Sequence, residues 1–323
     1  MLPLPIFKHH SPTTLDEAVA LMGELPEARL VAGGTDLIPN MKHGLVEPEH
    51  LVSLGRVEEL RGIAIEGDEL VIGAMTKLAT VAEDGRVREH APALAQACGL
   101  VGGPHHRRMG TLGGNVCLDT RCVYYNQTHF WREALGFCLK KDGTACHVVT
   151  SGQNCVAAAS NDSAPALMVL GGVIELVGKD GGRQISANDF YTPDGIYNVV
   201  KKPDEIVTRV RVPIVRGSTS AFEKLRRRGA IDFPLLNVAV RMAVEAGKIA
   251  DLDMVVSTLA ARPKRIKSAN KAVGREPSDE LWEELAQLAH KQCKPLTNLD
   301  NDPVWRRAMV KVLARKALAK AAG

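Results

Sequence analysis

The sequence has few aromatic residues and no long hydrophobic run. Phe, Trp and Tyr make up 4% of the 323 residues, and no window reaches the ~18 apolar residues that a membrane-spanning helix needs. The N-terminal stretch Met1-Leu2-Pro3-Leu4-Pro5 lacks the charged start and the apolar core of a secretory signal peptide. These absences predict a cytoplasmic protein without a membrane segment.

A strong excess of charge of one sign is also missing. The 41 Lys and Arg residues and the 37 Asp and Glu residues leave a formal net charge of +4. The basic run Arg226-Arg227-Arg228 is short, and no long basic stripe is interleaved with aromatic residues. The composition therefore argues against nucleic acid as the main partner, and it is ordinary for a globular chain of two or three domains.

Strand and helix patterns alternate along the chain and predict a mixed α+β protein. A cap at Ser11-Pro12-Thr13-Thr14 marks the start of the first helix. The turn Glu245-Ala246-Gly247-Lys248 joins two apolar runs and predicts a hairpin. The expected strands are 28–32, 51–54, 69–74, 173–177, 205–212, 238–244 and 249–258, and the expected helices are 15–22, 91–98, 264–273, 278–290 and 303–321.

Two glycine loops are candidates for binding phosphate. Gly33-Gly34-Thr35-Asp36 follows an expected strand directly, and Thr111-Leu112-Gly113-Gly114-Asn115 has the same character. Glycines let the backbone approach a phosphate closely, and successive free N–H groups form an anion-binding nest, although such a pair is also often a plain tight turn. Neither loop has the G-x-G-x-x-G pattern, so a dinucleotide bound here would use a fold other than the doubly wound one.

Four of the seven cysteines are gathered in one short segment, at Cys122, Cys138, Cys146 and Cys155. In a chain expected in the reducing cytoplasm, such a group favours metal binding over disulfides. The intervals of 15, 7 and 8 residues between them are not the ferredoxin run. Spacing alone leaves an iron–sulfur cluster, a zinc ion and no metal as open alternatives.

The other three cysteines are expected to be less important. Cys98 and Cys293 are interpreted as structural, and Cys117, directly after the second glycine loop, is the main rival ligand. His129 and His147 lie in the same segment, but four thiolates make them unnecessary. Within that segment Phe130, Trp131 and Phe137 are expected to form a small apolar core that shields a metal centre from water.

Four motifs in order resemble the FAD-binding subunit of the molybdenum hydroxylases, the family of xanthine dehydrogenase and carbon monoxide dehydrogenase. They are Ala32-Gly33-Gly34-Thr35-Asp36, Thr111-Leu112-Gly113-Gly114-Asn115, Asp162 with Ala164-Pro165-Ala166-Leu167, and Phe222-Glu223-Lys224. The resemblance covers nearly the whole chain. It implies an α+β fold with a two-part FAD-binding domain of the vanillyl-alcohol-oxidase/PCMH type, at 1–60 and 61–216. A C-terminal domain of a small antiparallel sheet with helices follows at 217–323.

The resemblance also implies which residues contact FAD. The segment that would wrap the pyrophosphate, chiefly by backbone N–H groups, is Arg29, Leu30, Val31, Ala32, Gly33, Gly34, Thr35 and Asp36. Thr111, Leu112, Gly113, Gly114 and Asn115 would bind it from the other side. Val101 and Val207 would pack on the cofactor, Asp162 would lie on its sugar-alcohol side, and Lys224 would reach the flavin ring. No general acid, base or nucleophile is expected on this chain.

An insertion distinguishes this chain from ordinary members of the family. Asn115 and Asp162 are 47 positions apart, and the extra segment at about 118–158 contains all four clustered cysteines. This combination is similar to the β subunits of the 4-hydroxybenzoyl-CoA reductases, in which an extra loop carries a 4Fe–4S cluster. The resemblance thus implies Cys122, Cys138, Cys146 and Cys155 as the ligands of such a cluster.

The same resemblance implies the partners. Reduced ferredoxin would donate electrons, a small subunit would hold 2Fe–2S centres, and a large subunit would hold the molybdenum cofactor, in a dimer of heterotrimers. The partner subunit would dehydroxylate 4-hydroxybenzoyl-CoA to benzoyl-CoA. One alternative is the FAD subunit of another molybdenum hydroxylase that oxidises an aromatic or heterocyclic substrate, with zinc or no metal in the insert. Another is a non-catalytic scaffold in which the glycine loops are simple turns.

Overall fold

The computed structural model describes residues 2–300 and 302–323, and in this part of the chain the strands form three sheets. The first is a small parallel sheet in the order β1-β3-β2, made of β1 (Lys8–His10), β2 (Arg29–Val31) and β3 (His50–Ser53). Helix α1 (Leu15–Glu24) begins where it was predicted, because Thr14 and Glu17 form a reciprocal capping box. Two short 3-10 turns, η1 (Leu54–Arg56) and η2 (Glu58–Leu60), lead to the next part.

The second sheet is antiparallel and forms the middle of the molecule. Its order is β4-β5-β8-β6-β7, with β4 (Ile63–Glu66), β5 (Glu69–Gly73), β6 (Val173–Gly178), β7 (Gly181–Ser186) and β8 (Ile206–Pro213). The helices between β5 and β8 are α3 (Leu78–Glu83), α4 (Gly85–His90), α5 (Pro92–Gly99), α6 (Pro104–Met109), α7 (Leu112–Val116), α8 (His129–Ala134), α9 (Ser163–Val169) and α10 (Ala187–Phe190).

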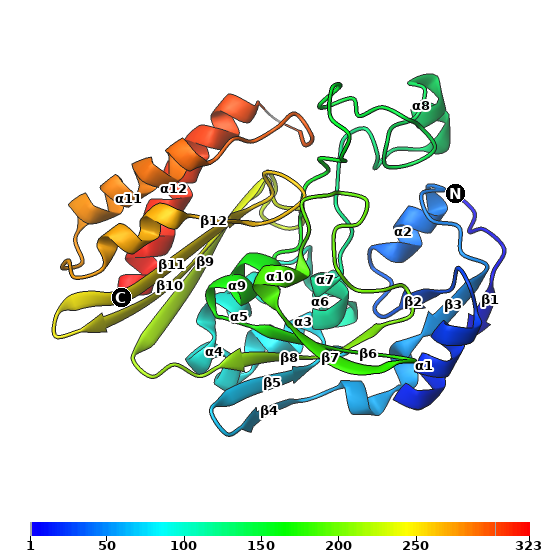
Figure 1. The fold of residues 1–323 in the computed structure, drawn as a ribbon, viewed down its shortest axis with the longest axis horizontal. Helices are drawn as coiled ribbons and strands as arrows, with labels where there is room; N and C mark the ends of the chain where they lie inside the picture. The colour runs from blue at the N-terminus through cyan, green and yellow to red at the C-terminus, as the bar shows by residue number, and fades with distance from the viewer. Residues whose placement is uncertain (1, 301) are drawn as a thin grey trace.

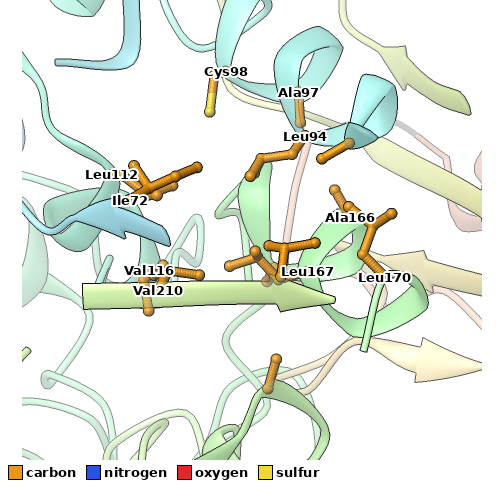
Figure 2. Packing of buried hydrophobic residues seen from close by; sticks show 14 of the residues in the cluster. Ile72, Leu94, Ala97, Cys98, Leu112, Val116, Ala166, Leu167, Leu170 and Val210 are labelled. Carbon is orange, nitrogen blue, oxygen red and sulfur yellow. The ribbon is translucent and has the colours of Figure 1, made fainter. Parts of the chain in front are cut away.

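The largest hydrophobic core lies between this second sheet and its helices. Figure 2 shows Leu94 of α5 and Leu167 of α9 on the same side of the strand that carries Val210. All three side chains are fully buried, and burying such a side chain stabilises the fold by about 1.5–3 kcal/mol. The core therefore fixes α7 and α9, the two helices between which the cysteine segment lies.

The third sheet belongs to the C-terminal part, in the order β12-β11-β10-β9. Its strands are β9 (Ser218–Leu225), β10 (Leu236–Glu245), β11 (Lys248–Ser257) and β12 (Lys264–Arg265), and α11 (Asp279–Gln292) and α12 (Pro303–Ala322) lie along it (Figure 1). The predicted hairpin is confirmed, with Ala246 and Gly247 at positive φ between β10 and β11. None of the described helices is both long enough and apolar enough to cross a bilayer.

One predicted helix of the C-terminal part is wrong. Instead of a helix over 264–273, the structure has the two-residue strand β12 followed by the 3-10 helix η3 (Lys267–Ala272). Lys264 and Arg265 pair with Val256 and Val255 of β11. Backbone hydrogen bonds to the free edge of β11 therefore outweigh the helical pattern of this segment.

The cysteine segment stands out from the rest of the fold as a loop-rich region that carries α8 (Figure 1). Its Arg132 side chain is 1% exposed and donates to the carbonyl oxygen of Gly44, just after α2 (Leu37–Lys42). The expectation that Phe130 and Trp131 form its core is wrong, because these side chains are 80% and 38% exposed. The buried apolar groups are instead Leu45, Tyr125 and Ala157, packed around the cysteines.

Candidate functional site

The first glycine loop has the geometry of an anion-binding nest. A Cβ on Gly33 would lie 2.2 Å from the Met109 carbonyl oxygen, and Gly34 has a φ of +70°, so both positions favour glycine. Within the described residues, the amides of Gly33, Gly34 and Thr35 donate no hydrogen bond. Half-buried N–H groups without a partner are free to bind phosphate oxygens.

The loop follows strand β2, which places the remaining residues expected around the pyrophosphate. Arg29 is exposed, whereas Leu30 and Val31 are half-buried. Ala32 through Asp36 are also half-buried and connect β2 to α2. The predicted contact segment is thus a single continuous stretch that begins on the strand and ends at a helix.

The second glycine loop is the start of the short helix α7 and not an open loop. Thr111 caps this helix by accepting from the Gly114 amide at 3.1 Å. The amides of Leu112 and Gly113 donate to the carbonyl oxygens of Thr76 and Ala74 at 3.0 and 2.8 Å. These three amides are therefore already paired, and a cofactor contact from this segment stays a prediction.

The two glycine segments lie against each other. A Cβ on the exposed Gly114 would be 3.8 Å from the Cβ of Ala32. Gly110, just before Thr111, approaches the first loop as well, since its Cβ would be 3.5 Å from Oγ1 of Thr35. Residues 75 and 82 positions apart in the chain are thus in contact, as a dinucleotide bound between the two segments would need.

Asp162 and Lys224, each expected beside the flavin, form a buried ion pair with each other. Lys224 Nζ lies 2.7 Å from Asp162 Oδ2 and donates to the Leu100 carbonyl oxygen at 2.9 Å. The side chains of Lys224 and Asp162 are 1% and 3% exposed. Burial raises the pKa of Asp162, and Lys224 opposes that rise. Leu100 precedes the half-buried Val101 in the chain. Val101 therefore lies near Asp162 and Lys224, the other two positions predicted beside the flavin.

Two further residues of this network were not predicted. Asn237 donates to Asp162 Oδ1 at 2.8 Å, and Ser163 donates to Asn115 Oδ1 from its amide at 3.0 Å and from its hydroxyl at 2.7 Å. Asn237 faces Lys224 in the β10–β9 register, so a correctly paired hairpin would have indicated it. Val207, by contrast, is buried in the large core.

The four clustered cysteines line one cavity. It is a small cavity of about 20 Å³, and Cys122, Cys138, Cys146 and Cys155 are each less than a tenth exposed. Burial raises the pKa of Cys122 to about 12, and the nearby thiols Cys155, Cys138 and Cys146 add to that rise. The rival Cys117 ends helix α7 and is not among the lining residues.

The chemistry of these four thiols limits which kinds of metal centre they could bind. In the described residues, no three Cys, His, Asp or Glu side chains are placed to hold a single metal ion. A tetrahedral zinc ion needs all its ligands about 2.0–2.3 Å from one atom. A polynuclear cluster accepts ligands that are further apart, because each thiolate binds a different iron. Four buried thiols at one cavity are a set of donors that suits an iron–sulfur cluster as well as a single ion.

Gly195, which the sequence pattern did not indicate, packs against one of the four cysteines. A Cβ there would lie 2.8 Å from the Cys155 sulfur, and its amide donates to the Cys155 carbonyl oxygen at 2.8 Å. Only a glycine allows so close an approach of the backbone to the thiol. The segment at 194–196, which is about 40 residues from Cys155 in the chain, thus holds the Cys155 side chain in place.

Comparison with known proteins assigns the class. Residues 5–215 match the family described as the FAD binding domain in molybdopterin dehydrogenase, and residues 220–321 match the CO dehydrogenase flavoprotein C-terminal domain. The chain therefore belongs to the FAD-binding subunits of the molybdenum hydroxylase family. The α+β fold and the FAD-binding, oxidoreductase character predicted from the sequence are confirmed.

Relatives match over almost their full length. The carbon monoxide dehydrogenase medium chain of Hydrogenophaga pseudoflava is 29% identical over 98% of this chain and 97% of its own. The xanthine dehydrogenase FAD-binding subunit of Escherichia coli O157:H7 is 24% identical over 97% and 95%. The structure of carbon monoxide dehydrogenase from H. pseudoflava that lacks the Mo-pyranopterin moiety superimposes with a TM-score of 0.81 at 28% identity, covering 99% of this chain and 98% of that one.

Proposed function

We propose that this chain is the electron-transfer subunit of a molybdenum enzyme, that it carries FAD and a 4Fe–4S cluster, and that the enzyme is of the 4-hydroxybenzoyl-CoA reductase type. The observation that carries the proposal is the convergence of four buried thiols on one cavity, in an insert next to the flavin-binding half. When bound, FAD exchanges one or two electrons and the cluster exchanges one.

The residues of this chain hold and separate the cofactors. The free amides of Gly33, Gly34 and Thr35 bind the pyrophosphate, and the buried Lys224 supplies a cation on the flavin side. Cys122, Cys138, Cys146 and Cys155 would ligate the cluster, and their burial would limit its contact with water. Redox-inert zinc at this position would give no path for electrons.

The partners follow from this role. A reduced ferredoxin would deliver single electrons, and a small subunit with 2Fe–2S centres would receive them. A large subunit with molybdenum would then use two electrons and two protons to replace the phenolic hydroxyl by hydrogen, which gives benzoyl-CoA and water. The complex is a dimer of such heterotrimers in the cytoplasm. Relatives named as medium chains and FAD-binding subunits support a place in a multi-subunit enzyme. The substrate does not contact this chain.

Analysis of the purified, anaerobically handled protein tests the proposal. We expect FAD together with about four irons and four acid-labile sulfides per chain. Cys138→Ser and Cys146→Ser should lower the iron content and abolish ferredoxin-driven turnover, while FAD stays bound. Cys117→Ser is the matched control and should keep its iron, because Cys117 does not line the cavity. Stoichiometric zinc or no metal, with flavin present, would instead favour the FAD subunit of another molybdenum hydroxylase.

A further inference from the structure

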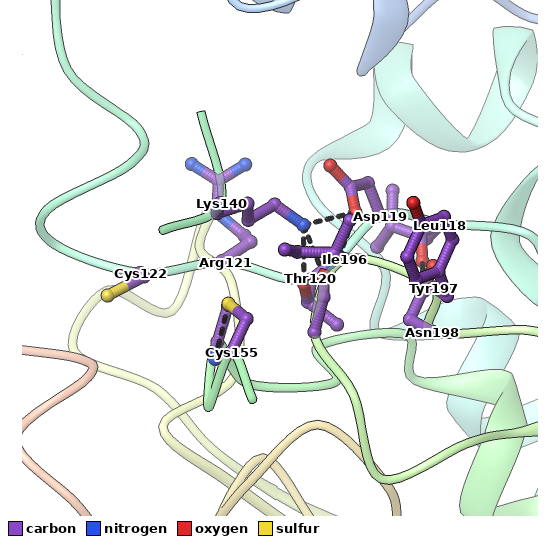
Figure 3. A network of polar contacts seen from close by, with 12 residues as sticks. Leu118, Asp119, Thr120, Arg121, Cys122, Lys140, Cys155, Ile196, Tyr197 and Asn198 are labelled. Atoms are coloured by element: carbon purple, nitrogen blue, oxygen red, sulfur yellow. Dashed lines mark hydrogen bonds and ion pairs between the residues drawn. The ribbon is translucent and has the colours of Figure 1, made fainter. Parts of the chain in front are cut away.

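Lys140 is a buried cation with a fixed position in the cysteine segment. Its side chain is 5% exposed, and lysine is almost never buried without a partner. Its Nζ lies 2.6 Å from Asp119 Oδ1, 2.7 Å from Thr120 Oγ1 and 2.5 Å from the Gly195 carbonyl oxygen (Figure 3). An ammonium group has three N–H donors, so these contacts use all of them and hold the charge in one place.

The residue that carries this charge lines the cysteine cavity. Lys140 is one of the lining residues, together with Cys138 and Cys155. Its Nζ lies 4.7 Å from the centre of the Tyr125 ring, which lines the same cavity. Lys140 also donates to the carbonyl oxygen of Gly195, and a Cβ on Gly195 would lie 2.8 Å from the Cys155 sulfur. The ammonium group is therefore held by the same residue that packs against the thiol.

We propose that Lys140 is a positioning residue whose charge raises the reduction potential of the metal centre held by the four cysteines. This inference rests on the proposed function, since it requires a redox-active centre in the cavity. One electron, supplied by the low-potential donor, enters the centre; no bond forms or breaks and no proton moves. Reduction adds one negative charge, and a nearby cation in a medium of low dielectric stabilises the reduced form more than the oxidised form.

Asp119 limits the size of this effect. Its carboxylate lies 2.6 Å from the Lys140 ammonium and partly cancels the positive charge that the centre experiences. Removing the lysine or removing the aspartate should therefore shift the potential in opposite directions. This opposition of sign separates an electrostatic role from a merely structural one, because general loosening of the cavity would not reverse its effect.

The test compares midpoint potentials of the metal centre in the full chain purified with its flavin, by redox titration followed by electron paramagnetic resonance. For Lys140→Met we expect the ratio of reduced to oxidised centre at a given potential to fall about tenfold, which is a midpoint potential lower by ~59 mV for one electron. Asp119→Asn should raise the midpoint potential, and Lys140→Arg should keep the unsubstituted value. Lys141→Met is the control, since Lys141 is a third exposed and pairs with Asp142.

The outcomes are distinguishable. Iron is measured first in the unsubstituted chain, and its absence overturns the proposed function and this inference together. Full iron content with unshifted potentials in both Lys140→Met and Asp119→Asn overturns the inference alone. If Lys140→Met loses iron, Lys140→Gln takes its place, because its amide can still donate to Thr120 or Gly195: a downward shift of the potential supports the role of Lys140, and no shift refutes it.

Discussion

The guanidinium group of Arg121 lies 3.4 Å from the carboxylate of Asp36. Asp36 ends the first glycine loop, and Arg121 directly precedes the first cysteine of the cavity. Arg121 also stacks over the ring of Phe233, 3.7 Å from its centroid, and so reaches the C-terminal part. Burial raises the pKa of Asp36, and Arg121 opposes that rise. One side chain therefore connects the proposed pyrophosphate loop, the start of the cysteine segment and the loop between β9 and β10.

Removing Lys224, the cation of the buried ion pair with Asp162, should destabilise the protein strongly. In Lys224→Met, Asp162 remains buried without its partner, which typically costs about 3–5 kcal/mol of unfolding free energy. Urea unfolding of the apoprotein measures this loss. The double variant Lys224→Met/Asp162→Asn should recover part of it, because no uncompensated charge is left. Equal stability of the single and double variants would contradict a coupled pair.

A methyl group at Gly33 should disrupt flavin binding. Its Cβ would lie 2.2 Å from the Met109 carbonyl oxygen, so Gly33→Ala must push the two glycine segments apart. Such overpacking typically costs about 1–3 kcal/mol. We expect flavin content, read from absorbance per chain, to fall sharply. Gly229→Ala is the control, since nothing lies within 4 Å of that position, and full flavin retention by Gly33→Ala would argue against the loop.

Gly195→Ala should act on the cysteine cavity and not on the flavin. The new Cβ would lie 2.8 Å from the Cys155 sulfur and would displace this ligand. The expected result is a loss of iron with flavin content unchanged, measured on the same sample. Gly182→Ala provides the comparison, because its nearest neighbour would be 3.5 Å away. Iron retained in full would mean that Cys155 is not a ligand.

Glu205 should make stability depend on pH. Hydrogen bonds from Arg183, at 2.7 and 2.9 Å, hold the pKa of Glu205 below its usual value of 4.5. Its contribution is therefore complete above about pH 4.5 and is lost as the pH falls through the lower folded-state value. At pH 7, Glu205→Gln should lower the unfolding free energy by about 1 kcal/mol. Unfolding curves recorded from pH 7 downward measure this. The difference in unfolding free energy between the unsubstituted protein and Glu205→Gln should disappear as the pH falls below about 4.5.

The sequence predicted the cysteines of the candidate site, but not the residues that hold them in position. The clustering of Cys122, Cys138, Cys146 and Cys155 was predictable because they are close in the chain, and the structure brings them to one cavity. Lys140 and Gly195 were not, since their contact joins residues 55 positions apart and depends on tertiary packing. The family resemblance predicted Asp162 and Lys224 as separate flavin contacts, and only the fold reveals that they pair.

The failures have physical reasons as well. Phe130 and Trp131 were expected inside because they are apolar, but a short helix on the outer side of a small segment has little core to face. Thr111 through Asn115 was expected as an open loop, whereas Thr111 is a good helix cap and starts α7. In both cases burial and hydrogen bonding depend on residues that are distant in the sequence, which local composition does not reveal.

The hydrogen bonds from Ser163 to Asn115 have a consequence for the segment between these two residues. They tie the helix before the cysteine segment to the helix after it, so the two ends of that segment emerge side by side from a common base. A change in the length of this segment therefore does not by itself separate α7 from α9. The proposed metal centre would lie in a part of the chain whose two ends are joined independently of it.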